Sequence, residues 1–179
     1  MRLLYYIQEK IDLPKKKWVS VPLSDLDQKM KQRLWHMYEE TYKSIGLHIE
    51  DVNKLTNKYK VSWMIDVDQD SDPDAFIIYK ETPYGNKIAL LGSDNKKLHK
   101  RLLVYKVLKL LRTKGWFVEA SHKLADIFVS KNINIIKDKK TIEKVLNKPN
   151  IQMINDEGLY KRKIGALGYK EKRLFGNIL

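Results

Sequence analysis

The order of apolar runs between residues 61 and 120 constrains the fold more than any other feature of the sequence. Residues 61–67, 75–81 and 87–91 have the composition of strands, and the segments between them are turns that contain Pro73 and the sequence Pro83-Tyr84-Gly85-Asn86. Consecutive strands that are joined by turns pair in antiparallel fashion. The sequence therefore predicts a three-stranded antiparallel meander.

A long helix follows the meander, from about Asn95 to Lys114, and Gly115 ends it. Residues 116–120 form a further strand. The strand before the helix and the strand after it should then be parallel neighbours, joined by a crossover. This order predicts a mixed α/β (α+β) sheet and excludes a doubly wound parallel one.

The flanking regions supply the remaining elements. Before the meander we expect a strand at residues 18–21, a helix that Ser24 or Asp25 caps and Gly46 ends, and a short helix around residues 49–59. After residue 120 the sequence predicts helices at 122–131 and 141–146, strands at 151–154 and 159–164, and a tail extending over 169–175. No repeat or linker divides the chain, so residues 1–179 are expected to form one domain.

The composition points to a cytoplasmic protein with a polyanionic partner. The net charge is +13, from 35 Lys and Arg against 22 Asp and Glu, and such an excess attracts nucleic acid, anionic membranes or phosphate-rich small molecules. A lysine-rich proteome is the alternative explanation of the charge. There are no cysteines, which excludes disulfides and thiolate metal sites. No apolar run has the length of a membrane span.

The stretch KIALLGSDNKKLHKRLL, from Lys87 to Leu103, contains the strongest local signal. An apolar strand turns there into a basic helix at a polar corner. Unpaired amides and the positive end of the helix dipole make such a corner a candidate anion site. The alternative is a solvated helix start that Ser93 or Asp94 caps, with its lysines facing water.

The chain resembles the GCN5-related N-acetyltransferase superfamily, most clearly from Lys87 to Ile133. Leu102-Leu103 matches the leucine pair that follows the coenzyme A pyrophosphate loop in that superfamily, and HKLADIFVSKNI looks like its next helix. The tail around Tyr160, Arg162, Lys172 and Gly176 is similar to tails of phage-encoded members. The resemblance implies a mostly antiparallel twisted central sheet with one parallel crossover, flanked by helices. It also implies acetyl-CoA or another acyl-CoA as donor, held by Leu91, Asp94, Asn95, Lys96, Lys97, His99 and Lys100.

The sequence departs from the superfamily pattern at two places. The loop glycines are absent, and side chains such as Lys97 and His99 crowd the approach of a pyrophosphate to the amides. Lys96, Lys97 and Lys100 can compensate as point cations. The tyrosine that often serves as general acid falls at Phe128, which has no proton to donate.

Candidate catalytic residues lie at the ends of the predicted strands. Glu119 is a candidate base for the attacking amine and His122 a candidate proton relay; alternatively, Glu119 pairs with a lysine and His122 begins the next helix. Tyr160 and Arg162 alternate on a late strand and therefore share a face. Tyr160 could replace the missing acid and Arg162 could hold a phosphate or carboxylate, or both could be structural.

An alternating acidic run from Asp66 to Asp74 stands out in this basic chain. Asp66 and Asp68 would share one strand face, where they could bind an amine or act as a base. Ala75 replaces the glycine that a calcium loop needs and Pro73 interrupts it, so no metal is predicted. The four tryptophans and ten tyrosines could stack on bases, but their spacing favours the core.

Two classes of function follow. The first is an N-acyltransferase in which an amine attacks an acyl-CoA thioester directly; the acceptor would be a small molecule, a protein or nucleic acid. The second is a catalytically inactive basic module of the same fold that binds nucleic acid or a virion or host protein. No membrane partner is expected.

Overall fold

The computed structural model describes residues 16–41, 58–67, 72–164 and 168–179. Asp68 and most of the helix expected around residues 49–59 lie outside these ranges. So does the expected end of the first helix at Gly46. Among the described helices, none is both long and apolar enough to cross a membrane.

The described residues form a nine-stranded sheet with eight strands in the order β1-β2-β3-β4-β5-β9-β8-β7, and β6 pairs with β9. Strands β1 to β4 are antiparallel to one another, which confirms the predicted meander and adds β1 to its edge. The parallel pairing of β4 with β5 confirms the predicted crossover. The strands are β1 (Lys16–Pro22), β2 (Tyr59–Asp66), β3 (Ala75–Thr82), β4 (Gly85–Ser93), β5 (Trp116–Ala120), β6 (Ile135–Ile136), β7 (Gln152–Met153), β8 (Tyr160–Lys163) and β9 (Tyr169–Asn177).

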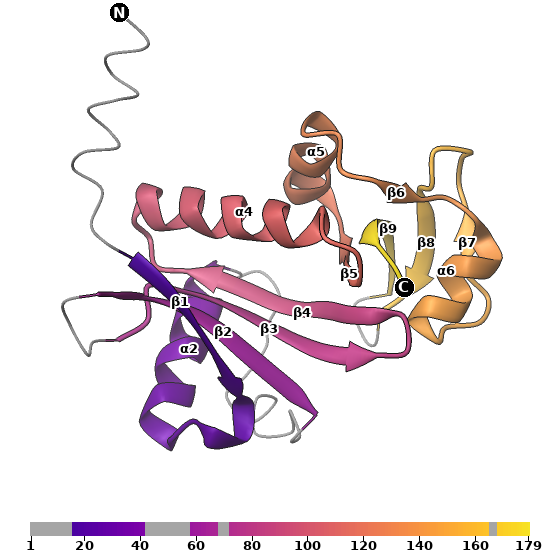
Figure 1. Cartoon of the computed structure of the whole chain (residues 1–179). Coiled ribbons are helices and arrows are strands. Elements are labelled where there is room, and N and C mark those ends of the chain that lie inside the picture. The colour runs from indigo at the N-terminus through magenta and orange to yellow at the C-terminus, as the bar shows by residue number, and fades with distance from the viewer. Residues whose placement is uncertain (1–15, 42–57, 68–71, 165–167) are drawn as a thin grey trace, which may run out of the picture.

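Helices cover both faces of this sheet (Figure 1). Helix α4 (Lys97–Leu111) and helix α5 (His122–Ser130) pack on one face, where Leu111 and Phe128 join the core with Ile77 and Val118. Helix α2 (Gln28–Thr41) packs on the other face. Helix α6 (Lys139–Leu146) covers the far end of the sheet, against β5 and the β8–β9 hairpin. Because side chains alternate along a strand, Ala75, Ile77 and Tyr79 point to the α4 face and Phe76 and Ile78 to the α2 face.

The cap expected for the first helix is wrong, and so is the cap that the alternative interpretation gave to α4. Neither Ser24 nor Asp25 caps the first helix; both lie in the 3-10 turn Leu23–Asp25, and Asp27 accepts the Met30 N–H at 2.7 Å as the cap. The N-cap position of α4 is Lys96, with no side-chain cap hydrogen bond, rather than Ser93 or Asp94. In both cases the helix begins a few residues later than the sequence predicted.

The backbones of β5 and β9 come so close at Gly176 that only glycine fits there. Gly176 on β9 has φ +124, and a Cβ there would lie 2.1 Å from the Trp116 carbonyl oxygen. Only glycine adopts this conformation without strain. Gly176 therefore allows β9 to lie against β5 and to position the β8–β9 hairpin beside Glu119.

Candidate active site

Strands β4 and β5 separate in the middle of the sheet, and a cavity opens between them. Their pairing runs from Asn86 with Trp116 to Ile88 with Val118 and stops there. At the same point the register of β3 against β4 skips Ala89, which is a β-bulge. The cavity of about 210 Å³ is lined by Tyr38, residues 88–91, residues 118–121, Leu124 and Lys172. Of the residues predicted to bind the donor, Leu91 lies in this cavity.

Glu119 is the acidic residue of this cavity, and two residues of β8 bind it. Arg162 Nε donates to Oε2 at 2.6 Å and Arg162 Nη2 to Oε1 at 2.5 Å, which is a bidentate ion pair. The Tyr160 hydroxyl donates to Oε2 at 2.7 Å. Only 7% of the Glu119 side chain is exposed, and Tyr160 is fully buried. The sequence placed Tyr160 and Arg162 on one face of a strand, and in the structure both contact the same carboxylate.

These contacts shift the pKa values of the network in opposite directions. Burial acts to raise the pKa of Glu119, but the hydrogen bonds and charge of Arg162, together with the Tyr160 hydrogen bond, outweigh it and leave that pKa lowered. Burial raises the pKa of Tyr160, and the negative charge of Glu119 raises it further. In this arrangement Glu119 is therefore an ionised, weak base, and Tyr160 holds its proton firmly.

Two lysines lie within electrostatic reach of this carboxylate. Burial lowers the pKa of Lys87 on β4 and of Lys172 on β9, while the charge of Glu119 opposes the shift in both. Arg162 pushes both pKa values further down. Lys87 was not among the site residues predicted from the sequence. Its position inside an apolar strand, two residues before Ala89, was the signal in the sequence that could have indicated a functional lysine.

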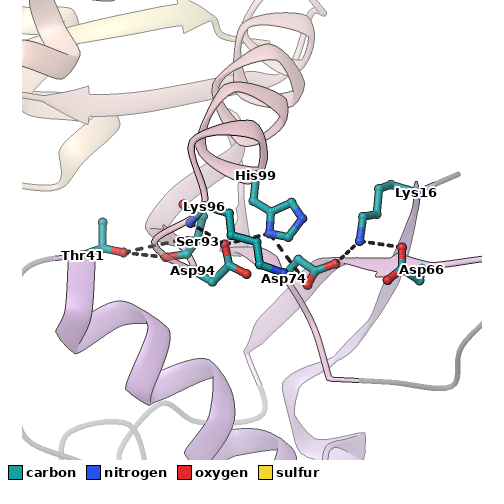
Figure 2. A network of polar contacts seen from close by, with 8 residues as sticks. All are labelled: Lys16, Thr41, Asp66, Asp74, Ser93, Asp94, Lys96 and His99. Atoms are coloured by element: carbon teal, nitrogen blue, oxygen red, sulfur yellow. Dashed lines mark hydrogen bonds and ion pairs between the residues drawn. The ribbon is translucent and has the colours of Figure 1, made fainter. Parts of the chain in front are cut away.

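A second polar network lies at the start of α4 (Figure 2). Asp94 Oδ1 accepts from the Lys96 N–H at 3.0 Å and lies 2.7 Å from His99 Nδ1, so Nδ1 carries a proton in this contact. Asp74, directly before β3, lies 3.8 Å from the same nitrogen. Thr41 joins the end of α2 to this corner by donating to the Ser93 carbonyl oxygen at 3.0 Å.

This network changes how the corner can bind an anion. His99, predicted to contact the donor, is 3% exposed and is bonded inward to Asp94, and Asp94 already occupies the Lys96 N–H. Asn95, Lys96, Lys97 and Lys100 are exposed around the first turn of α4. The exposed cations, together with the positive end of the helix dipole, remain the groups that can receive a phosphate.

The other candidate residues lie apart from the Glu119 network. Asp66 is 2.5 Å from Lys16, which also contacts Asp74 at 2.6 Å, so Asp66 belongs to the network of Figure 2. His122 is exposed at the first position of α5, with φ +51, directly after Ser121 of the cavity wall. Phe128 is fully buried and packs edge-on against Phe175 at 5.2 Å between ring centres.

Asp74, Asp94 and His99 place three ligand-type atoms within 4.8 Å of one another. The Lys16 ammonium lies 2.6 Å from Asp74 and would repel a divalent cation there. Hydrogen bonds and ion pairs within the network account for the arrangement of these side chains, because His99 bonds Asp94 and Lys16 bonds both Asp66 and Asp74.

Comparison with solved structures identifies the fold. The ribosomal-protein-S18-alanine N-acetyltransferase from Escherichia coli aligns with 92% of this chain and 94% of its own, at a TM-score of 0.53 and 11% identity. Escherichia coli ElaA aligns with 89% of this chain and 99% of its own, at a TM-score of 0.52 and 10% identity. An acyl-CoA N-acyltransferase from Pseudomonas aeruginosa aligns with 69% of this chain and 92% of its own, at a TM-score of 0.51 and 12% identity. The chain therefore has the fold expected from its resemblance to the GCN5-related N-acetyltransferases.

Comparison of the sequence alone gives no such match. No protein-family model matches the chain, and no curated protein matches it.

Proposed function

We propose that this protein is an N-acyltransferase that transfers an acetyl or related acyl group from acyl-CoA to an amine. The observation that carries the proposal is the cavity at the Ala89 bulge, where β4 and β5 separate beside Glu119. Separated strands expose backbone N–H groups that a thioester carbonyl oxygen can use as hydrogen-bond donors. The exposed lysines at the start of α4 would hold the phosphates of the donor.

The reaction in this proposal is a direct displacement. The amine nitrogen attacks the thioester carbonyl carbon, the carbon–sulfur bond breaks, and the thiolate leaves with the bonding electrons. The nitrogen loses one proton and the thiolate gains one. Glu119 would accept the first proton, for which its ion pair with Arg162 must open, because that pair lowers the pKa of Glu119.

Tyr160 would donate the second proton. The negative charge of Glu119 helps to keep the pKa of Tyr160 high, so protonation of Glu119 removes part of what holds the Tyr160 proton. The hydrogen bond between the two groups would therefore couple gain of the amine proton to loss of the hydroxyl proton. His122 would assist as a relay beside Ser121 of the cavity wall. Asp66 and Asp68 would bind a further cationic group of the acceptor, for which the ion pair of Asp66 with Lys16 must open.

Isothermal titration with acetyl-CoA and with coenzyme A tests the proposal. We expect saturable binding that Lys97→Glu with Lys100→Glu weakens by about tenfold, because two of the cations that face the donor phosphates are reversed. The paired variant Lys29→Glu with Lys109→Glu changes the net charge equally on exposed positions of α2 and α4 and should bind normally. Equal behaviour of the two double variants would place the donor elsewhere.

The second candidate is a basic module of the same fold without turnover. The polar network at the start of α4 favours this second candidate. Asp94 already accepts from the Lys96 N–H, which a pyrophosphate would use, and His99 points inward. Salt-dependent binding of DNA or RNA, together with no binding of acetyl-CoA, would select this candidate.

A further inference from the structure

A second cavity lies at the opposite end of β4 from the start of α4. It has a volume of about 600 Å³ and lies between the β3–β4 hairpin and the C-terminal end of α6. Figure 1 shows that hairpin beside α6, away from the first turn of α4. Four lysines line it, with a single glutamate: Lys58, Lys80, Lys87, Lys144 and Glu81. A cavity of this volume suits a ligand the size of a nucleotide.

The residues that line this cavity neutralise little of its positive charge. Glu81 forms an ion pair with Lys60, which lies outside the lining. Lys80 lies over the Tyr59 ring at 5.9 Å and Lys144 over the Tyr84 ring at 5.5 Å, contacts that stabilise a cation only modestly. The C-terminal dipole of α6 offsets about half a charge. Most of the lysine charge therefore remains available to a ligand.

Lys87 connects this cavity to the candidate active site. Its side chain lines the cavity, and it pairs with Phe117 of β5, two residues before Glu119 on the same strand. The Lys87 ammonium also feels the charge of Glu119. Within residues 16–41, 58–67, 72–164 and 168–179 the Lys87 side chain forms no hydrogen bond or ion pair, and Lys80, Lys148 and Arg162 add positive charge around it. Burial lowers the pKa of Lys87, and the charge of Glu119 only partly opposes this shift.

We propose that this lysine cavity binds a phosphate group of the acyl acceptor. The proposal rests on the proposed function, since Lys87 would hold the anionic part of the acceptor beside Glu119, where the amine is to react. Lysines bind phosphate as point cations and impose no fixed fork geometry. The phosphate could belong to a small phosphorylated amine or to a nucleic-acid backbone, and both would meet the same four ammonium groups.

Calorimetric titration with inorganic pyrophosphate tests this proposal, using protein saturated with coenzyme A so that the donor site is filled. Lys80→Gln with Lys144→Gln should weaken pyrophosphate binding by about tenfold and leave coenzyme A binding unchanged. Lys29→Gln with Lys109→Gln removes the same charge from exposed positions and should have no effect. If pyrophosphate does not bind, or if both double variants weaken it equally, the proposal is overturned.

A short single-stranded DNA distinguishes the two sources of phosphate. If the nucleic acid is the acceptor, DNA should bind with a steep salt dependence, and the Lys80 and Lys144 variants should weaken it as they weaken pyrophosphate. If pyrophosphate alone responds to these variants, a small phosphorylated amine is the acceptor. If coenzyme A does not bind at all, pyrophosphate titrated into the free protein still tests the cavity, so failure of the donor site and failure of this cavity are distinguishable.

Discussion

Replacing Arg162 should expose how strongly the Glu119 carboxylate depends on its partner. Arg162→Gln removes a bidentate ion pair from a carboxylate that is 7% exposed. Breaking a buried pair from one side costs about 3–5 kcal/mol, because the remaining charge stays buried. Lys87 and Lys172 lie close enough to compensate in part, so we expect a loss near 3 kcal/mol in the free energy of unfolding at neutral pH.

The pH dependence of this loss has a definite sign. The lowered pKa of Glu119 gives wild-type protein stability that is present above the unfolded glutamate pKa of about 4.3 and is lost as the pH falls through the folded pKa. In Arg162→Gln burial is no longer outweighed, so the pKa of Glu119 rises. The difference between variant and wild type should therefore be largest at neutral pH. It should begin to shrink as the pH falls through the raised pKa of Glu119 in the variant, and should shrink further below about pH 4.3, where the wild type loses its own contribution.

Urea denaturation, followed by the fluorescence of the four tryptophans, measures the free energy of unfolding of variant and wild type at neutral and at acidic pH. The double variant Glu119→Gln with Arg162→Gln is the control, because it removes the charge as well as its partner and should recover most of the lost stability. A loss below about 1 kcal/mol at pH 7, or a double variant as unstable as the single one, would refute the reasoning.

Further predictions concern the cavity beside Glu119, the close contact of β9 with β5 at Gly176, and the polar network at the start of α4. Ala89→Trp fills the cavity from an exposed position, so it should abolish coenzyme A binding in calorimetry while the thermal midpoint stays within a few degrees. Gly176→Ala should lower the unfolding free energy by at least about 2 kcal/mol in urea, since φ +124 and the Trp116 carbonyl both exclude a Cβ; an unchanged midpoint would mean that β9 shifts freely. Asp94→Ala should cost about 1–3 kcal/mol because it leaves the buried His99 ring without its acceptor, whereas Asp94→Asn should recover part of this.

The sheet could be predicted from the sequence because its signals are local. Strand periodicity in residues 61–67, 75–81 and 87–91 and the turns between them determine the meander, and Gly115 marks the end of the crossover helix. Strand β6 was missed because Ile135–Ile136 is too short to show a period. The first helix was placed too early because Ser24 and Asp25 are also good caps, and only the 3-10 turn distinguishes them from Asp27.

The candidate site could be predicted only in part, because its contacts join distant parts of the chain. Tyr160 and Arg162 share a face by strand alternation, but their common partner Glu119 is more than forty residues away. Lys16 reaches Asp74 across 58 residues, and no local pattern indicates such a pair. His99 was expected to face the donor, yet burial and the Asp94 carboxylate turn it inward. The β-bulge at Ala89 depends on the register of β3, which residue types alone do not fix.

A crystal structure of the protein with coenzyme A tests the central claim most directly. We expect the sulfur between the separated ends of β4 and β5, in contact with Ala89 and Ser121, and the pyrophosphate at the exposed lysines of α4. Coenzyme A bound in the lysine cavity at the β3–β4 hairpin, with the space beside Glu119 unchanged, would contradict it.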